Sequence, residues 1–289
     1  GYDIDIVLDL IDNYIDGFHN SYEWGYSIPY FLAGSHSAHV NNISYLSAKA
    51  GIASRDINFL LNRLDPVERK RYDYSLLEKT YLDYQNTHCE DDSAIASLQN
   101  ALSGKDILVL LPGHTIKTCQ RQIQHFYKEK NPIVISVNLL TDCYPIDFAY
   151  FSNKNRYQYW RNEAAFNKCK KIVTSNVTTR KDDNLFIIDF LRLVKCGWEQ
   201  LDNSGVLLLR LLDLMNVNSI SIAGFDGYSH NSENPNYVEK AMEKTRNTLN
   251  AEEANKDIKS MLVDYKNTRK SSCPISFITP SYFETVMDE

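Results

Sequence analysis

Residues 107–116 read ILVLLPGHTI, an apolar run that ends in a proline and a glycine and leads at once into a helical pattern. Consecutive apolar residues bounded by turn residues are typical of a strand that is buried on both faces, as the strands of a parallel sheet are. The glycine turn then lets the chain reverse into a helix. This stretch therefore predicts a strand, a turn and a helix of an α/β protein.

The same alternation of short apolar runs and helical patterns continues through the rest of the chain. The expected strands are Ile107–Leu111, Ile133–Val137, Phe148–Phe151, Lys171–Thr174, Leu185–Ile188, Ser219–Ala223 and Ile275–Ile278. The expected helices are Ile116–Lys128, Tyr157–Asn167, Gly205–Asn216 and Asn250–Tyr265. We therefore predict an α/β fold in which residues 105–289 form a Rossmann-like, doubly wound domain with a mostly parallel sheet.

The residues upstream of this domain show apolar side chains at helical spacing, as in the stretch 4–15, and no β alternation. They predict an all-helical module over residues 1–90, followed by a linker with a short helix over residues 91–104. The chain opens inside a helical pattern and without a methionine. We interpret it as a piece of a longer protein, with Gly1 as an added residue.

Charge and hydropathy limit the kinds of partner. The 289 residues carry a formal net charge of −6, which argues against a protein that mainly binds nucleic acid or an anionic membrane. No apolar run approaches the roughly 20 residues of a membrane span, and no secretory signal is present, so a cytoplasmic protein is expected. Residues 1–104 hold 7 basic and 15 acidic residues, against 24 and 22 in residues 105–289. The second domain therefore stays open to a small anionic ligand.

Neither cysteine nor histidine spacing predicts a metal site. The six cysteines are scattered without a CxxC pair, which favours reduced thiols. His36 and His39 are three residues apart and could share a helix face, but no HxH or HExxH pattern and no third ligand accompany them. Exposed or capping histidines are the preferred interpretation, and no metal or cofactor is expected.

Small polar residues follow the first three expected strands of the second domain. Gly113, His114 and Thr115 form a glycine turn before a helix, a geometry that offers backbone N–H groups to a phosphate. Thr115 could equally be only an N-cap. Asn138 ends the second strand, where it could contact a nucleotide or cap a turn, and Ser152 and Asn153 end the third. Because these strand ends share one edge, they predict a polar ligand site there.

The strand Ser219–Ala223 runs into a loop that reads GFDGYSH over residues 224–230. Asp226 and His230 are the one neighbouring carboxylate and imidazole at a predicted strand end, so they are the candidates for a general base. The alternative is that Asp226 caps the loop and His230 is merely exposed.

Residues 105–230 resemble a family of bacterial proteins that modify surface polysaccharides and flagellin, distantly similar to the CMP-sialic-acid sialyltransferases. In that family a Gly-Pro-Ser or Gly-x-Ser turn follows the first strand, an asparagine ends the second, and a later strand leads into a Gly-[Phe/Ile]-Asp-x-Tyr segment. The matching positions are Gly113, Thr115, Asn138, Ser152, Asn153, Gly224, Phe225, Asp226 and Tyr228. Thr115 stands where serine is usual, and His114 replaces a small residue of the family's turn.

This resemblance implies that the domain binds a nucleotide-sugar, expected to be a CMP-activated acidic sugar. The sugar would pass to a carbohydrate acceptor, without a metal, in surface polysaccharide biosynthesis. The nucleotide would be held by Gly113, His114, Thr115, Asn138, Ser152, Asn153, Gly224 and Tyr228. Tyr228 would donate a hydrogen bond to the departing phosphate, and His230 or Asp226 would accept the proton of the acceptor hydroxyl.

Residues 2–86 resemble the helical region that follows the barrel in HMG-CoA-lyase-like proteins, which include 4-hydroxy-2-oxovalerate aldolases. The stretches 24–34 and 39–45 carry this likeness, and the family's metal ligands are absent from them. The alternative function is therefore an accessory or ligand-binding region of an aldolase-like protein, with no chemistry of its own. Its helical module would close or dimerise an upstream barrel, so a homodimer fits this interpretation. A pure interaction module is a third hypothesis.

Overall fold

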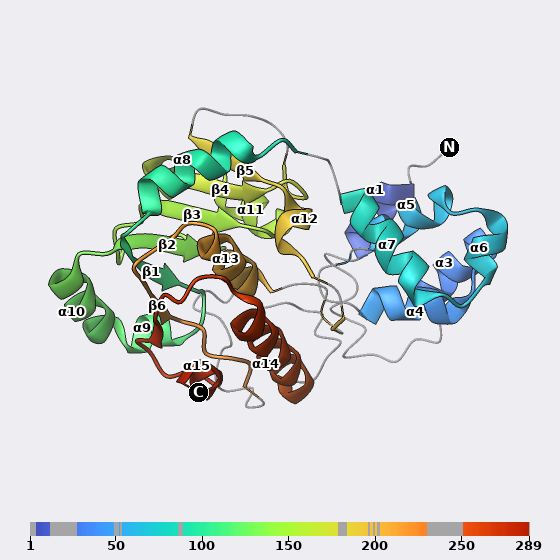
Figure 1. Cartoon of the computed structure of the whole chain (residues 1–289). Coiled ribbons are helices and arrows are strands. Elements are labelled where there is room, and N and C mark those ends of the chain that lie inside the picture. The colour runs from blue at the N-terminus through green and yellow to red at the C-terminus, as the bar shows by residue number, and fades with distance from the viewer. Residues whose placement is uncertain are drawn as a thin grey trace. The chain divides into compact units, whose positions relative to one another are not determined.

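The structure, a computed structural model, describes residues 4–11, 28–48, 52, 54–85, 89–178, 184–195, 197–198, 200, 203–229 and 251–288. The chain divides into two compact units (Figure 1). The first unit comprises residues 1–85, 199–201 and 244–249, and the second comprises residues 86–198, 202–243 and 250–289.

Helices make up the regular structure of the described part of the first unit. They are α1 (Ile4–Leu10), α3 (Ile28–His36), α4 (Val40–Ala48), α5 (Ser54–Arg63), α6 (Pro66–Lys70) and α7 (Tyr74–Gln85). Asp65 and Glu68 form a capping box at the start of α6. The apolar faces of the helices meet in one cluster of buried side chains that includes Leu32, Ile43 and Leu61. The apolar residues that recur at helical spacing in the sequence are thus the residues that form this core.

His36 and His39 do not share a helix face. Helix α3 ends at His36, and the next residue, Ser37, has a φ of 50°, which is outside the helical region. His39 lies just before α4, and its Nδ1 atom accepts a hydrogen bond from the backbone N–H of Asn41 at 3.3 Å. His36 instead has its Nε2 atom 2.7 Å from Oδ1 of Asn58 in α5.

The second unit is built on a seven-stranded sheet in which every pair of neighbouring strands is parallel. The strands are β1 (Asp106–Leu110), β2 (Ile133–Val137), β3 (Phe148–Phe151), β4 (Lys170–Thr174), β5 (Leu185–Ile188), β6 (Ser219–Ala223) and β7 (Ile275–Phe277). Their spatial order is β5-β4-β3-β2-β1-β6-β7. The prediction of an α/β fold with a parallel sheet is confirmed.

The helices of this unit are α8 (Asp92–Leu102), α9 (Thr115–Thr118), α10 (Gln120–Lys130), α11 (Lys154–Trp160), η2 (Ala164–Lys168), α12 (Phe190–Leu193), α13 (Ser204–Asp213), α14 (Ala251–Thr268) and α15 (Glu284–Asp288). Two of the expected helices are therefore split. Cys119 has φ −103° and ψ 22°, so the chain leaves the helical region between α9 and α10. Likewise, the expected helix Tyr157–Asn167 is divided between α11 and η2.

Side chains from both helices and strands form the core of the second unit. Leu108 and Leu110 of β1 join one cluster with Ile123 of α10 and Trp160 of α11. Helix α13, which is buried along most of its length, contacts β2 and α14. The alternating residues of β1 are thus buried on both sides, as the continuous apolar run predicted.

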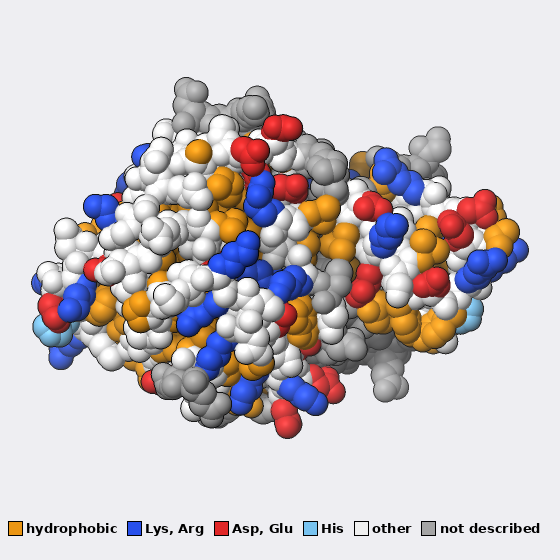
Figure 2. Space-filling view, viewed as in Figure 1, with side chains coloured by type: hydrophobic (Ala, Val, Ile, Leu, Met, Phe, Trp, Pro, Cys, Tyr) orange, Lys and Arg blue, Asp and Glu red, His pale blue; other side chains and the backbone are white. Residues whose placement is uncertain are grey.

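Basic side chains gather over α12, α13 and α14 on the face shown in Figure 2. Lys195 and Arg210 both pair with Asp264 of α14, with N–O distances of 2.6 and 3.5 Å.

Within the part of the chain that the structure describes, no helix has the length and apolar character that a membrane crossing requires.

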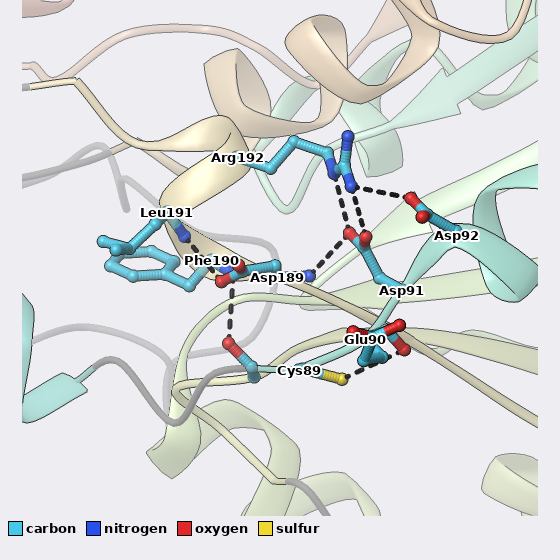
Figure 3. A network of polar contacts seen from close by, with 9 residues as sticks. Cys89, Glu90, Asp91, Asp92, Asp189, Phe190, Leu191 and Arg192 are labelled. Atoms are coloured by element: carbon cyan, nitrogen blue, oxygen red, sulfur yellow. Dashed lines mark hydrogen bonds and ion pairs between the residues drawn. The ribbon is translucent and has the colours of Figure 1, made fainter.

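The start of α8 is tied to the segment after β5 by a polar network (Figure 3). Asp91 is 2% exposed and accepts hydrogen bonds from Nε and Nη2 of Arg192 at 2.9 and 2.5 Å. The backbone N–H of Asp189, the N-cap of α12, donates to the same carboxylate at 3.0 Å. The short helix expected between residues 91 and 104 is therefore anchored on the second unit.

Candidate functional site

The order of the strands defines a topological switch point, which is the place at the carboxyl edge of the sheet where the chain changes the direction in which it adds strands. Strand β1 lies between β2 and β6, so the chain proceeds in one direction from β1 to β5 and then returns to the other side of β1. In open parallel sheets, ligands bind outside the carboxyl ends of the strands at such a switch point. The segments that leave β1 and β6 here are residues 111–115 and 224–228, both of which we singled out from the sequence.

These two segments are bonded to each other. The backbone N–H of Thr115 donates to Oδ2 of Asp226 at 2.8 Å, and the Thr115 hydroxyl donates to Oδ1 of the same carboxylate. The N–H of Gly113 donates to the carbonyl oxygen of Gly224 at 2.9 Å. The carboxylate of Asp226 thus accepts hydrogen bonds from the turn whose donors we expected to bind a phosphate.

Two glycines make this close contact possible. A Cβ atom on Gly113 would lie 2.4 Å from the carbonyl oxygen of Gly224 and 2.7 Å from Oδ1 of Asp226. Gly224 has a φ of +76°, and a Cβ atom there would lie 2.1 Å from the carbonyl oxygen of Leu111. Any side chain at either position would push the β1 and β6 segments apart.

Opposing effects act on the carboxyl group of Asp226. Burial raises its pKa above the ordinary value of 3.8, while the hydrogen bonds from Thr115 and the nearby His114 act to lower it. Because desolvation is the largest of these effects, Asp226 holds a proton more readily than an exposed aspartate does. That direction suits a group that takes up a proton during a reaction.

Thr279, which follows β7, completes this junction and was not found from the sequence. Its hydroxyl oxygen accepts a hydrogen bond from the backbone N–H of Gly224 at 2.9 Å and lies 3.0 Å from the hydroxyl oxygen of Thr115. Thr279 is separated from Thr115 by 164 positions, and a threonine just after a short strand carries no local signal of its partner.

A second polar group, the Asn138 cluster, lies at the ends of β2, β3 and β4 and consists of Asn138, Ser152, Asn176 and Ser204. The hydroxyl of Ser204, the first residue of α13, accepts from Nδ2 of Asn138 at 2.8 Å and from the hydroxyl of Ser152 at 2.7 Å. Nδ2 of Asn176 donates to the carbonyl oxygen of Ser152 at 3.2 Å. Two of the sequence-predicted residues, Asn138 and Ser152, are therefore brought together.

The Asn138 cluster contains acceptors that are not used. The buried Oδ1 atoms of Asn138 and Asn176 receive no hydrogen bond from the described residues. Asn138 is only 9% exposed and has a φ of 52°, a conformation that asparagine tolerates better than most residues. Buried amide oxygens usually have a hydrogen-bond donor, and among the described residues these two acceptors have none, so they are open to a donor from a ligand.

The other candidate residues serve different purposes or lie elsewhere. The side chain of Asn153 accepts from the backbone N–H of Arg156 and caps α11. His114 is the partly buried residue before α9, and Tyr228 follows the turn at Gly227 in the β6 segment. His230, the other candidate base, lies outside the described residues.

Ser204 and Asn176 were missed because their signals are weak. Ser204 follows Asn203, whose side chain accepts from the backbone N–H groups of Gly205 and Val206 and caps α13. A helix start after a polar residue is detectable in a sequence, but its neighbours at the sheet edge are not. Among the described residues, no group of three or more histidine, cysteine or acidic side chains is placed to hold a metal.

No family model matches this chain, and no match is found among curated proteins or solved structures.

Proposed function

We propose that the second unit is a Rossmann-like domain that binds a nucleotide-sugar and transfers its sugar to a carbohydrate acceptor, as a sialyltransferase-like enzyme does. The expected donor is a CMP-activated acidic sugar. The observation that supports this proposal is the Asn138 cluster at the carboxyl edge, with its two unused amide oxygens. Parallel sheets bind nucleotides at this edge.

The unused acceptors call for a ligand that donates hydrogen bonds. A buried acceptor without a donor costs about 1–3 kcal/mol, and a donor from the ligand removes that cost. Ribose hydroxyls, sugar hydroxyls and the amino group of a base are all such donors. A nucleotide-sugar carries several of them, whereas inorganic phosphate at neutral pH is mainly an acceptor.

The chemistry would take place beside this cluster, at the switch point. In the proposed reaction, Tyr228 donates a hydrogen bond to the departing nucleoside monophosphate as its negative charge develops. Asp226 or His230 accepts the proton of the acceptor hydroxyl, and the oxygen of that hydroxyl forms the new glycosidic bond. The raised pKa of Asp226 supports its role as the proton acceptor.

Calorimetric titration of the chain with CMP, CDP, UDP and GDP tests the binding step. We expect at least one of them to bind and the Asn138→Ala variant to bind it about tenfold more weakly, because the variant loses the amide of the cluster. The matched control is Asn216→Ala. Asn216 has a φ of 51°, close to the 52° of Asn138, but it lies before β6, at the opposite end of the sheet. Absence of heat and of chemical-shift changes with all four nucleotides contradicts the proposal.

One observation favours the alternative of a ligand-binding region without chemistry, as the tail of an aldolase-like protein. Both carboxylate oxygens of Asp226 already accept from Thr115, so this side chain also holds the fold together. Replacing His230 and Asp226 by alanine separates the two proposals. Loss of sugar transfer with nucleotide binding retained supports the enzyme, and detectable transfer by the double variant excludes these residues as the base.

A further inference from the structure

The β6 loop, residues 224–228, is held at almost every backbone position by residues from distant parts of the chain. The N–H of Gly224 donates to Thr279, as described above. The carbonyl oxygen of Phe225 accepts from the hydroxyl of Ser281 at 2.5 Å, and that of Asp226 accepts from the N–H of Tyr282 at 3.0 Å. The segment that follows β7 thus runs along the β6 loop and fixes its first half.

The second half of the β6 loop is fixed by a single side chain, Asn255 of α14. The backbone N–H of Tyr228 donates to Oδ1 of Asn255 at 2.8 Å, and Nδ2 of Asn255 donates to the carbonyl oxygen of Tyr228 at 2.8 Å. Asn255 is 3% exposed, so water does not compete for these bonds. The side-chain amide carries the same donor and acceptor as a peptide group and pairs with Tyr228 as a neighbouring strand would.

The β6 loop also has little room to move between its two supports. Gly227 has a φ of +90°, and a Cβ atom there would lie 2.8 Å from Cβ of Tyr282 and 3.1 Å from Oδ1 of Asn255. The chain therefore passes between α14 and the segment after β7 with space for a hydrogen atom only. The position of the Tyr228 backbone follows from this fit.

We propose that Asn255 is a positioning residue for nucleotide binding, acting through Tyr228 at the end of the β6 loop; this rests on the proposed function. Asn255 does not touch the ligand. It holds the backbone of Tyr228 so that the phenol is already oriented when the nucleotide arrives, and a ligand group then binds without first ordering the loop. Misplacement of such a loop by about 1 Å is enough to weaken an interaction that depends on direction.

The experiment measures the dissociation constant of the bound nucleotide and the melting temperature for the full chain and its variants. In Asn255→Ala both bonds to Tyr228 are lost, and we expect about tenfold weaker binding. In Asn255→Asp the acceptor for the Tyr228 N–H remains, but a carboxylate oxygen replaces the donor and faces the carbonyl oxygen of Tyr228, so we expect a loss of affinity in this variant too. This second variant tests the proposal if the alanine variant fails to fold.

The matched control is Asp213→Ala. Asp213 also holds a loop by its side chain, because its carboxylate accepts from the backbone N–H groups of Lys270 and Ser271 at 2.9 and 2.7 Å. That loop precedes β7 and lies at the opposite end of the strands from the site. We expect this variant to lose stability without losing nucleotide affinity.

A double variant, Asn255→Ala with Tyr228→Phe, identifies the route of the effect. If Asn255 acts through the phenol of Tyr228, the double variant binds no more weakly than the weaker of the two single variants. The role of Asn255 is overturned if the double variant shows the product of the two single-variant losses of affinity, or if both Asn255 variants bind the nucleotide as tightly as the wild type. Either result leaves the proposed function in place. A chain that binds none of the four nucleotides overturns the proposed function and this role with it.

Discussion

Gly224 joins the β1 and β6 segments through a backbone conformation that other residues adopt at a cost. Its φ is +76°, and an added Cβ atom would lie 2.1 Å from the carbonyl oxygen of Leu111 and 2.6 Å from Cγ1 of Ile116. We expect Gly224→Ala to lower the free energy of unfolding by about 3–5 kcal/mol, through strain and overpacking together. Urea denaturation measures this change.

Gly104 provides the comparison for that prediction. It has a similar φ of +67°, but nothing lies within 4 Å of an added Cβ atom. Gly104→Ala should therefore cost only about 1–2 kcal/mol, from backbone strain alone. Equal losses in the two variants would mean that the contact between the β1 and β6 segments is not tight.

The carboxyl group of Asp226 gives stability a definite dependence on pH. Its pKa in the fold is raised above 3.8 by burial, so the contribution of this group is complete below about pH 4 and is lost as the pH rises through the folded pKa. Asp226→Asn cannot ionise. As the pH rises above about 4, we expect the wild type to lose stability relative to this variant, as measured by urea denaturation at each pH.

Asp106 supplies a control of opposite sign. Hydrogen bonds from Ser219 and Asn218, both at 2.6 Å, lower the pKa of this carboxyl group. Its contribution is present above the ordinary value of 3.8 and is lost as the pH falls through the folded pKa. The wild type should therefore lose stability relative to Asp106→Asn on acidification. The same sign for both variants would contradict the assignment of burial as the main effect at Asp226.

At the scale of elements, the network in Figure 3 links helix α8 to helix α12. Asp91 is buried and charged, and Arg192 supplies two of its hydrogen bonds. Because Arg192→Met leaves the carboxylate of Asp91 with the Asp189 N–H as its remaining donor among the described residues, we expect a loss of about 2–3 kcal/mol, less than for a fully buried pair. The arginine side chain is 39% exposed, which accounts for this reduction.

The ion pair between Lys168 and Asp142 serves as the reference for the network. Its side chains are 67% and 82% exposed, so Lys168→Met should change the free energy of unfolding by less than about 0.5 kcal/mol. Chemical denaturation of both variants measures the two changes in the free energy of unfolding. Similar small changes in the two would show that the Asp91 network does not anchor α8.

At the scale of the whole molecule, each of the two units has a buried core of its own. Leu61 is 1% exposed in the first unit, and Leu208 of α13 is fully buried in the second. Separate cores favour separate unfolding, so we expect two transitions in calorimetry. Leu61→Ala and Leu208→Ala should each lower a different transition, by about 2–5 kcal/mol of stability. A single transition that both variants shift equally would contradict this expectation.

The sequence by itself determined the strands of the sheet. The bounds of β2, β3, β5 and β6 agree with the predicted runs, β4 and β7 differ by one residue at one end, and β1 differs by one residue at each end. These runs are short, apolar and bounded by turn residues, and that signal is local. The helices were less predictable, because the break at Cys119 changes the backbone without interrupting the helical pattern.

The sequence also indicated which residues gather at the carboxyl edge, since parallel strands end on the same side. Only the tertiary structure decided how they pair. The carboxylate of Asp226 meets Thr115 across 111 positions of the chain, and Ser204 joins Asn138 across 66. Such contacts depend on which strands are neighbours and how closely two glycine-containing segments approach. The local periodicity of the sequence carries no information about strand neighbours or about the approach of two segments, because it shows which residues are buried and not which residues they contact.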